Sequence, residues 1–512
     1  MRVLSLSKYL RGKRLLLVYI AVVAAYISFF WAFKYIPTQD GPANLSSAVV
    51  FTSLLGGHSP YTDFYELRWR PSPYWAYHAF MAPVLAVCRP LAAEKIFVSL
   101  YLVVFALAGW CITKAAAGKA SALGLLYLIF ATSFPFQMGF FNFMLGAAAV
   151  LLTVAFFWAR RERAGLRFWI FLNLLATACY GAHLVAWFAA TVSIWVLSYW
   201  LVLTTPRKRF FSLAPVYLLP SYLLPLYYGA VTPKKGEYVY HKLGWMIREL
   251  VSADFLISFG SAQRFLAWGV AALFAFLIAA AALGRLRAAR RSLRPPDVFA
   301  AGAVVFVAIF LAMPGRTPQA AYYISERMAL FPFLFLTPWL AACVPRRLMR
   351  YAAGVAVAAV LANLLPLGKY YARENAKLET FTSGYCAVAP RAVLLPIIKD
   401  PTARGRRVES LRHAAAYYVI ERYGRNLVDM AANAAHFPIT YAPGVATPRY
   451  VGTFSNLRVY DLETARPAPD VVISYNINPF VPGIGPVFKY YAPVYFKGRL
   501  IIYERMAGVL KR

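Results

Sequence analysis

The sequence has few charged residues. Asp, Glu, Lys and Arg make up 14% of its 512 residues, whereas a soluble globular protein carries about 25%. A chain with so little charge and with 61% hydrophobic residues is neither a soluble multidomain enzyme nor a disordered protein. The composition instead indicates a protein with many membrane-spanning segments.

Acidic residues are the scarcest charged type. The chain has 20 Asp and Glu against 54 Lys and Arg, a formal net charge of +34. In a soluble domain this excess would suggest nucleic acid binding, but no basic-aromatic motif of an RNA- or DNA-binding module is present. In a membrane protein the same excess reflects cytoplasmic loops and contact with anionic headgroups. We therefore expect membrane lipids, and no nucleic acid, as partners.

Cysteine is also scarce. The five cysteines form no CxxC pair and no spacing typical of a metal site, which excludes a disulfide scaffold and a cysteine-based zinc site. We expect them to be small core residues. They are Cys88, Cys111, Cys179, Cys343 and Cys386.

Long apolar runs dominate the first 370 residues. The first run, 15–33, has 19 residues, enough to span a bilayer, and no obvious signal-peptide cleavage site follows it. We therefore predict a first transmembrane helix that is not cleaved off. About eleven spans are expected in all. The others lie near 96–113, 120–137, 142–159, 168–182, 184–204, 211–230, 265–283, 298–313, 328–344 and 351–367. The three prolines in 211–230 predict a kinked or broken helix there.

Another apolar stretch, 73–87, is ambiguous. Counting it as a span would place the basic loop 160–167 outside, against the positive-inside rule. An amphipathic helix in the outer interface removes this conflict, and its aromatic residues suit the headgroup level. With the helix expected at 43–55, the first outer loop would contain two interfacial helices.

The loop charges set the orientation. With this assignment the inside loops hold 22 Lys and Arg in about 53 residues, against 12 in about 117 for the outside loops. We therefore predict a cytoplasmic amino terminus, a transmembrane domain over 1–368 and a soluble extracytoplasmic domain over 369–512. The latter is expected to be a small α/β domain, with strands at 392–398, 470–475 and 499–503 and a helix at 409–423.

An acidic residue follows the first predicted span. Asp40 lies between Pro37 and Pro42 in Tyr35-Ile36-Pro37-Thr38-Gln39-Asp40-Gly41-Pro42. A carboxylate held near the bilayer surface can act as a general base or bind a divalent metal, and the residues leave both roles open. The structural alternative is that Asp40 or Gly41 lies near the cap of the helix 43–55.

Further polar residues lie on the predicted outer face. Because polar residues at or inside membrane spans are costly, each of them is a candidate functional residue. Arg and Lys at a membrane edge suit a lipid-linked phosphate, because Arg binds two oxygens at once and Lys supplies a point charge. Headgroup anchoring, or a hydrogen-bonded helix end for the histidine, is the alternative. The candidates for substrate binding are Arg327, Glu326, His183, Asn142, Arg89, Lys95 and Asp63.

This arrangement resembles the GT-C superfamily of polytopic glycosyltransferases, which includes protein O-mannosyltransferases and aminoarabinose transferases. Their first outer loop begins with an acidic motif and contains two interfacial helices, and Arg70-Pro71-Ser72-Pro73-Tyr74-Trp75 is similar to the proline-rich start of the second. The mannosyltransferases carry paired Asp-Glu, whereas Asp40 is followed by Gly41. A divalent metal therefore stays an open question.

The resemblance implies an enzyme that moves a sugar from a polyprenyl-phosphate donor to a glycan, lipid or protein acceptor on the outer face, in a bacterial inner membrane. Asp40 would be the general base. Arg327, with Arg89 or Lys95, would hold the leaving phosphate.

Three other functions stay open. A transporter or flippase of lipid-linked sugars would use similar cations, but it usually has internal repeats and polar residues at the bilayer midplane, and neither is visible here. An O-antigen ligase or polymerase would rely on a large late outer loop, for which 231–264 is a modest candidate. A non-catalytic scaffold is the third.

Overall fold

The computed structural model describes residues 2–233, 236–287, 293–318, 322–400, 406–445, 468–477 and 485–506. The chain packs as two compact units. The first comprises 1–32, 98–136 and 141–368, and the second comprises 33–97, 137–140 and 369–512. One boundary between the two units follows Gly368, where the outer domain was expected to begin. The division into a membrane domain and an outer domain stays a prediction.

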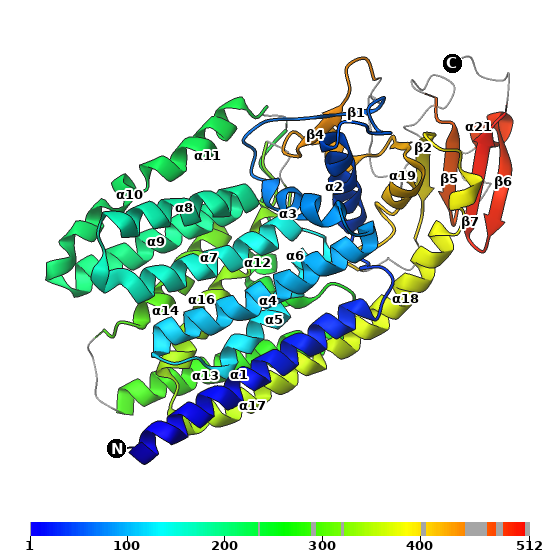
Figure 1. Cartoon of the computed structure of the whole chain (residues 1–512). Helices are drawn as coiled ribbons and strands as arrows, with labels where there is room; N and C mark the ends of the chain where they lie inside the picture. Colours follow the sequence, from blue (N-terminus) through cyan, green and yellow to red (C-terminus); the bar gives the residue numbers. More distant parts are fainter. Residues whose placement is uncertain are drawn as a thin grey trace. The chain divides into compact units, whose positions relative to one another are not determined.

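The first unit is helical (Figure 1). Its described elements are α1 (Arg2–Trp31), most of α4 (Pro90–Ala117), η1 (Ala122–Leu126), α5 (Tyr127–Ala131), α6 (Phe134–Gln137), α7 (Phe141–Arg160), α8 (Leu166–Ala182), α9 (Leu184–Thr204), η3 (Pro206–Leu213), α10 (Ala214–Tyr217), α11 (Leu219–Val231), α12 (Leu243–Val251), α13 (Ser261–Arg287), α14 (Asp297–Ala312), α15 (Ile324–Met328), α16 (Phe331–Cys343), α17 (Arg346–Ala362) and the start of α18 (Leu364–Thr382).

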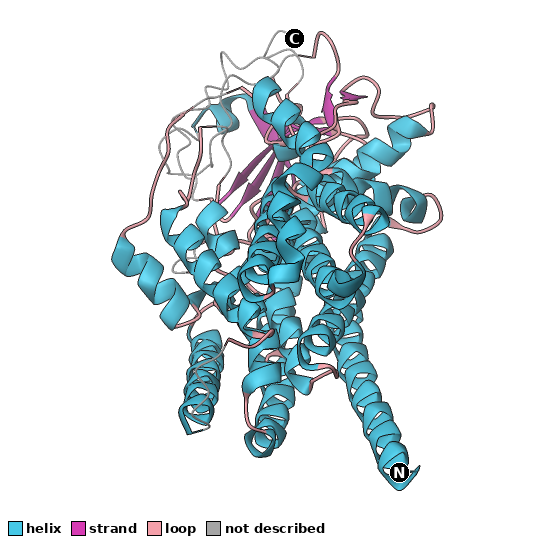
Figure 2. Cartoon of the chain, turned by 90° about the vertical axis from the view of Figure 1, so that its left-hand side faces the viewer, coloured by secondary structure: helices cyan, strands magenta, loops and turns pink. Residues whose placement is uncertain are grey.

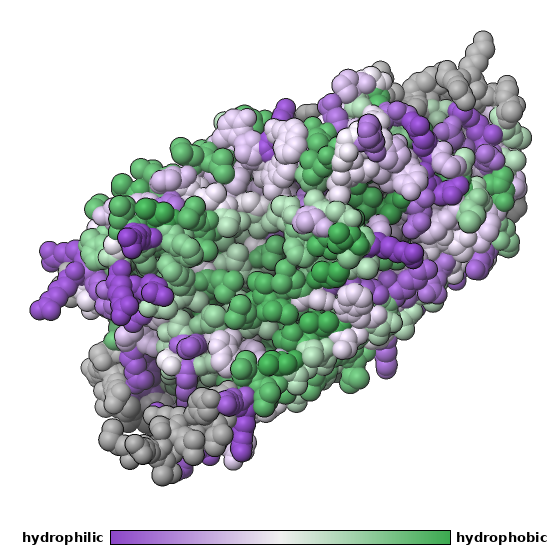
Figure 3. All heavy atoms as spheres, in the orientation of Figure 1, coloured by the Kyte–Doolittle hydropathy of each residue, from purple (hydrophilic) through white to green (hydrophobic). Residues whose placement is uncertain are grey.

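Seven helices within the described ranges are long and apolar enough to cross a membrane, so this is an integral membrane protein. They are Lys13–Trp31, Pro90–Ala117, Phe141–Arg163, Leu184–Thr204, Arg207–Val231, Ser261–Leu286 and Arg346–Ala387. Every other predicted span overlaps a shorter helix. On the face drawn in Figure 3, apolar atoms cover much of the helical part, as expected of a surface that contacts lipid. The number of eleven spans stays a prediction.

The proline-rich span is broken, as predicted. The helix is interrupted at Leu218, between α10 and α11. Pro215 and Pro220 stand in the first turns of α10 and α11, where a missing N–H costs little.

The first and last long helices of this unit are joined by buried hydrogen bonds. The Tyr26 hydroxyl of α1 donates to the Val360 carbonyl of α17 at 2.8 Å, and the side-chain amide of Asn363, the residue after α17, donates to the Tyr26 hydroxyl at 3.2 Å. Figure 1 draws α1 and α17 side by side. Helices in lipid gain much of their association from such packing and polar contacts.

The second unit holds every β-strand of the described chain (magenta in Figure 2). It contains α2 (Gly41–Leu55) and α3 (Trp75–Leu85), which confirm the two helices expected in the first outer loop. Between them, β1 (Tyr65–Leu67) pairs antiparallel with β4 (Ile439–Tyr441). The outer loop and the carboxyl-terminal segment therefore form one folded body.

This unit also contains a five-stranded mixed sheet, in the order β3-β2-β5-β7-β6, and the helices α20 (Met430–Asn433) and α21 (Gly485–Tyr490). The strands of this sheet are β2 (Val393–Ile398), β3 (Arg425–Asn426), β5 (Val471–Tyr475), β6 (Tyr491–Lys497) and β7 (Leu500–Arg505). The three strands predicted from the sequence are confirmed. β2 pairs parallel with β3 and β5, and β7 pairs antiparallel with β5 and β6.

Helices and predicted segments differ at two places. The helix at the last predicted span, 351–367, continues beyond 367, because α18 reaches Thr382 with Pro366 in its first turn, where proline is tolerated. The end of that span stays a prediction, whereas the predicted start of the next helix was wrong. The helix expected from Glu409 begins only at Ala416, as α19 (Ala416–Arg422). The Glu409 N–H instead donates to the Gln39 side chain at 3.2 Å, so a tertiary contact replaces the first helical turn.

Candidate functional site

Asp40 lies at the start of α2, in a loop fixed by backbone hydrogen bonds. Its N–H donates to the Met138 carbonyl at 2.9 Å, and the Gln39 N–H donates to the Gln137 carbonyl at 3.0 Å. The Asn44 N–H closes the first helical turn on the Asp40 carbonyl. The backbone of Asp40 is thus held from both sides by the second unit.

Two glycines allow this close packing. Gly139 has a φ of +84°, and a Cβ on it would lie 2.6 Å from the Gly41 nitrogen. A Cβ on Gly41 would collide with the Thr38 hydroxyl. The Asn44 side-chain amide donates to the Gly139 carbonyl at 2.8 Å. Any larger residue at either glycine would displace the Asp40 segment.

The Asp40 carboxylate does not cap the helix. Asp40 occupies the N-cap position, but its side chain makes no capping hydrogen bond. Instead the Gln39 amide nitrogen lies 3.3 Å and the His413 Nε2 3.5 Å from its Oδ1. Its side chain is 12% exposed. The structural alternative, that Asp40 lies near the helix cap, is therefore confirmed for its backbone position, while its carboxyl group contacts Gln39 and His413.

His413 is the basic partner of Asp40, and it is uncharged at neutral pH. Burial, and then the charge of Arg412, lower the pKa of His413 to about 3. A neutral imidazole can donate an N–H hydrogen bond to a carboxylate without neutralising its charge. The imidazole of His413 therefore adds no positive charge beside the Asp40 carboxyl group.

The lowered pKa of His413 predicts a loss of stability in mild acid. Below pH 6.5, His413 binds a proton in the unfolded chain but not in the folded protein. The free energy of unfolding therefore falls as the pH drops from 6.5 toward 3. The slope due to this group approaches about 1.4 kcal/mol per pH unit. In thermal unfolding measured from about pH 4 to about pH 7, His413→Gln should be less pH-sensitive than the wild type. Equal slopes would contradict the buried neutral histidine.

A buried carboxylate on α18 positions the segment that carries His413. Glu374 is 1% exposed and lies 2.9 Å from both Arg406 Nη1 and Lys377 Nζ. The Ser410 hydroxyl donates to it at 2.6 Å. Since Arg406 and Ser410 belong to the turn before α19, Glu374 fastens that turn three residues before His413.

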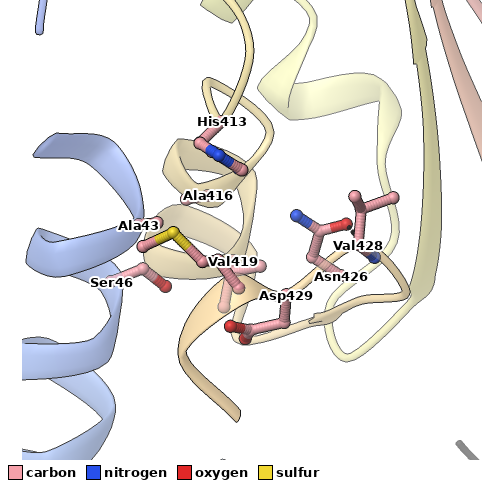
Figure 4. A pocket seen from close by; sticks show the side chains of 9 residues that line it. Ala43, Ser46, His413, Ala416, Val419, Asn426, Val428 and Asp429 are labelled. Carbon is pink, nitrogen blue, oxygen red and sulfur yellow. Dashed lines mark hydrogen bonds between the residues drawn. The ribbon is translucent and has the colours of Figure 1, made fainter. Parts of the chain in front are cut away.

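His413 also lines a small pocket (Figure 4). The figure shows the polar side chains of Ser46, Asn426 and Asp429 around it, which come from α2, β3 and the loop after β3. The pocket is lined by Ala43, Ser46, His413, Ala416, Val419, Asn426, Val428, Asp429 and Met430. His413 thus contacts both Asp40 and this hollow.

Three predicted site residues lie elsewhere in the second unit. Asp63 is exposed and forms an ion pair with Arg391. Arg89 is exposed just before α4, and half-buried Lys95 follows the buried Glu94 in its first turns. Their roles in substrate binding stay proposals.

The other four predicted residues belong to the helical unit. Phe143 connects three of them: the Arg327 guanidinium lies 5.7 Å from its ring, the His183 ring lies 5.4 Å from it, and Asn142 precedes it. Arg327 is 6% exposed and donates to the Tyr322 carbonyl at 3.1 Å.

Glu326 lies beside this group. Its Oε1 is 3.2 Å from His241 Nε2, and the His241 ring stacks on Trp245 at 4.0 Å. This contact joins the segment before α12 to α15.

Sequence reasoning missed His413, Glu374 and the role of Gln39. A single histidine or glutamate in a tail without a motif has no periodicity or spacing that marks it. Only the register between the outer loop and the tail brings these residues to Asp40.

No group of three or more His, Cys, Asp or Glu side chains suited to a metal occurs in the described part of the chain. The divalent metal left open by the sequence has no such ligand set among these described residues.

No protein-family model matches the sequence, and no curated protein matches it. The fold is similar to that of ArnT from Cupriavidus metallidurans. The apo structure is 11% identical, covers 96% of this chain and 98% of ArnT, and gives a TM-score of 0.51. The structure bound to undecaprenyl phosphate is also 11% identical, covers 97% of this chain and 99% of ArnT, and gives the same TM-score. The chain thus has the fold of ArnT, as the resemblance to the GT-C superfamily implied.

Proposed function

We propose that the protein transfers a sugar from a polyprenyl-phosphate donor to an acceptor hydroxyl, with Asp40 as the general base. The observation that carries this proposal is the position of the Asp40 carboxylate. It stands at a helix start without capping it, next to a neutral imidazole and a side-chain amide. A carboxylate fixed in this way is available to take a proton.

The reaction is a single displacement. The acceptor oxygen attacks the anomeric carbon while the bond from that carbon to the phosphate oxygen breaks. The hydroxyl proton moves to Asp40, and the electron pair leaves with polyprenyl phosphate. Gln39 and His413, both in contact with the carboxylate, orient it toward the attacking hydroxyl.

The donor class is supported by the fold. ArnT has been solved with undecaprenyl phosphate bound, and a lipid phosphate is the ligand that buried Arg327 would suit, since guanidinium binds phosphate oxygens in pairs. Glu326, His183 and Asn142 are proposed to line the same substrate-binding region, and Arg89, Lys95 and Asp63 to contribute polar contacts. The acceptor is a glycan, lipid or protein.

The loop charges support an orientation for the reaction. Because the basic residues gather in the loops 160–167, 205–210 and 284–296, we propose that these face the cytoplasm and that Asp40 works on the outer face of a bacterial inner membrane.

The experiment is donor turnover by the purified protein in liposomes, with a panel of polyprenyl-phosphate sugars. Release of free polyprenyl phosphate is expected, and Arg327→Ala should weaken donor binding by about 1.5–3 kcal/mol, the worth of a hydrogen bond to a charged group. Arg264→Ala, an exposed arginine at the start of α13, is the control. Movement of intact donor across the bilayer without cleavage would instead identify a transporter.

A further inference from the structure

A second acidic residue lies buried beside the Asp40 segment. Glu94, in the first turns of α4, is 1% exposed, and its Oε1 has no hydrogen-bond partner among the described residues. The position that a Cβ on Gly41 would occupy is 3.4 Å from this oxygen. Glu94 therefore reaches the residue directly after Asp40.

Two buried hydroxyls belong to the same packed segments, Thr38 and Tyr417, and the Tyr417 ring centroid lies 5.1 Å from that of Tyr35, three residues before Thr38. The Thr38 hydroxyl contacts the same position on Gly41, and it also lacks a hydrogen-bond partner in the described ranges. The Tyr417 hydroxyl is buried without one as well, within the part of the chain that the structure describes. Thr38 and Tyr417 are 0% and 2% exposed.

Glu94 and Tyr417 are close enough to affect one another. Burial first, and then the Glu94 carboxyl, raise the pKa of Tyr417 well above its usual value. Its hydroxyl is therefore a permanent hydrogen-bond donor. Burial and then Glu94 act in the same way on the pKa of Tyr77. The cluster combines a buried carboxyl group with buried hydroxyls.

Leaving three such groups buried and unsatisfied would be costly. A buried polar group without a partner costs about 1–3 kcal/mol, and a charged one costs more. Lys95, the neighbouring cation, is only half-buried. Buried water typically makes about three hydrogen bonds to groups that otherwise have none, and the Glu94 carboxyl oxygen with two hydroxyls supplies that number.

We propose that Glu94, Thr38 and Tyr417 bind buried water, and that this water site positions Asp40. Thr38 lies two residues before Asp40, and Tyr417 lies four residues after His413. A water between them would join the same two segments that provide the Asp40–His413 contact, with Glu94 bridging from α4. Glu94 is then a positioning residue, and this role rests on the proposed function of Asp40.

The test compares the activity of apolar and polar replacements of Glu94. Glu94→Leu removes a water ligand, and we expect kcat for donor cleavage to fall about ten- to a hundredfold at an unchanged KM, since small misplacements of catalytic groups have effects of this size. Glu94→Gln, which keeps an acceptor oxygen, should retain most of the activity. Tyr417→Phe should lower kcat, whereas Tyr418→Phe, which loses a hydrogen bond to the Phe381 carbonyl, should affect stability alone.

An experimental density map that resolves ordered water provides a second readout. Water bound between Glu94, Thr38 and Tyr417 in the wild type, and lost in Glu94→Leu, is the expected result. A dry contact among these groups would overturn the inference at any level of activity, and so would equal kcat values for Glu94→Leu and Glu94→Gln. A wild type that binds this water but cleaves no donor would overturn the role in catalysis while leaving the water site in place.

Discussion

Replacing Asp40 with Asn should lower kcat by at least about a hundredfold, because general-base catalysis typically contributes two to four orders of magnitude. The change removes the charge and the proton acceptor but keeps the shape. The backbone hydrogen bonds of Asp40 to Met138 and Asn44 do not depend on the carboxylate. The variant should therefore insert and fold normally. Sugar transfer at saturating donor and acceptor, with the unfolding temperature measured in parallel, checks both parts.

A matched carboxylate provides the control for Asp40. Glu66 lies in the same outer loop, on β1, but it is exposed. Glu66→Gln should keep wild-type kcat. Full activity of Asp40→Asn would remove Asp40 from the role of base. A loss that follows a lower unfolding temperature would assign it a structural role instead.

Replacing Glu374 with Ala should cost about 3–5 kcal/mol of stability, the range for removing one partner of a buried ion pair. The side chains of Arg406 and Lys377, 10% and 13% exposed, would lose this anion, although Lys377 keeps Asp400 at 2.7 Å. Ser410 would lose its acceptor. Because this turn positions His413, transfer activity should fall together with the unfolding temperature.

Glu379 is the control on the same helix. It is exposed, five residues after Glu374, and Glu379→Ala should change stability little, as exposed charges usually contribute less than about 1 kcal/mol. If Glu374→Ala and Glu379→Ala unfold at the same temperature, Glu374 does not hold the turn.

The sequence predicted well what depends on local pattern. Apolar runs of bilayer length predicted the helices, because a backbone in lipid must satisfy its own hydrogen bonds. Alternating and β-branched stretches in the tail predicted β2, β5 and β7. The two helices of the first outer loop were also predictable. The loop charges satisfy the positive-inside rule only if the apolar stretch 73–87 does not cross the membrane.

The sequence could not predict which distant residues surround Asp40. The pairing of β1 with β4 joins segments more than 370 residues apart, and no local pattern encodes such a pairing. The helix predicted from Glu409 began late for the same reason, because Gln39 and Glu374 bind its first residues. Tertiary contacts overrode local propensity where the candidate site is assembled.

The most direct test of the central claim is the anomeric configuration of the transferred sugar, measured by nuclear magnetic resonance on the product of a cleaved polyprenyl-phosphate donor. If Asp40 activates the acceptor for a single displacement, the configuration at the anomeric carbon must be inverted relative to the donor. A retained configuration would mean that a covalent sugar–enzyme intermediate forms first, and it would contradict the role of Asp40 as general base.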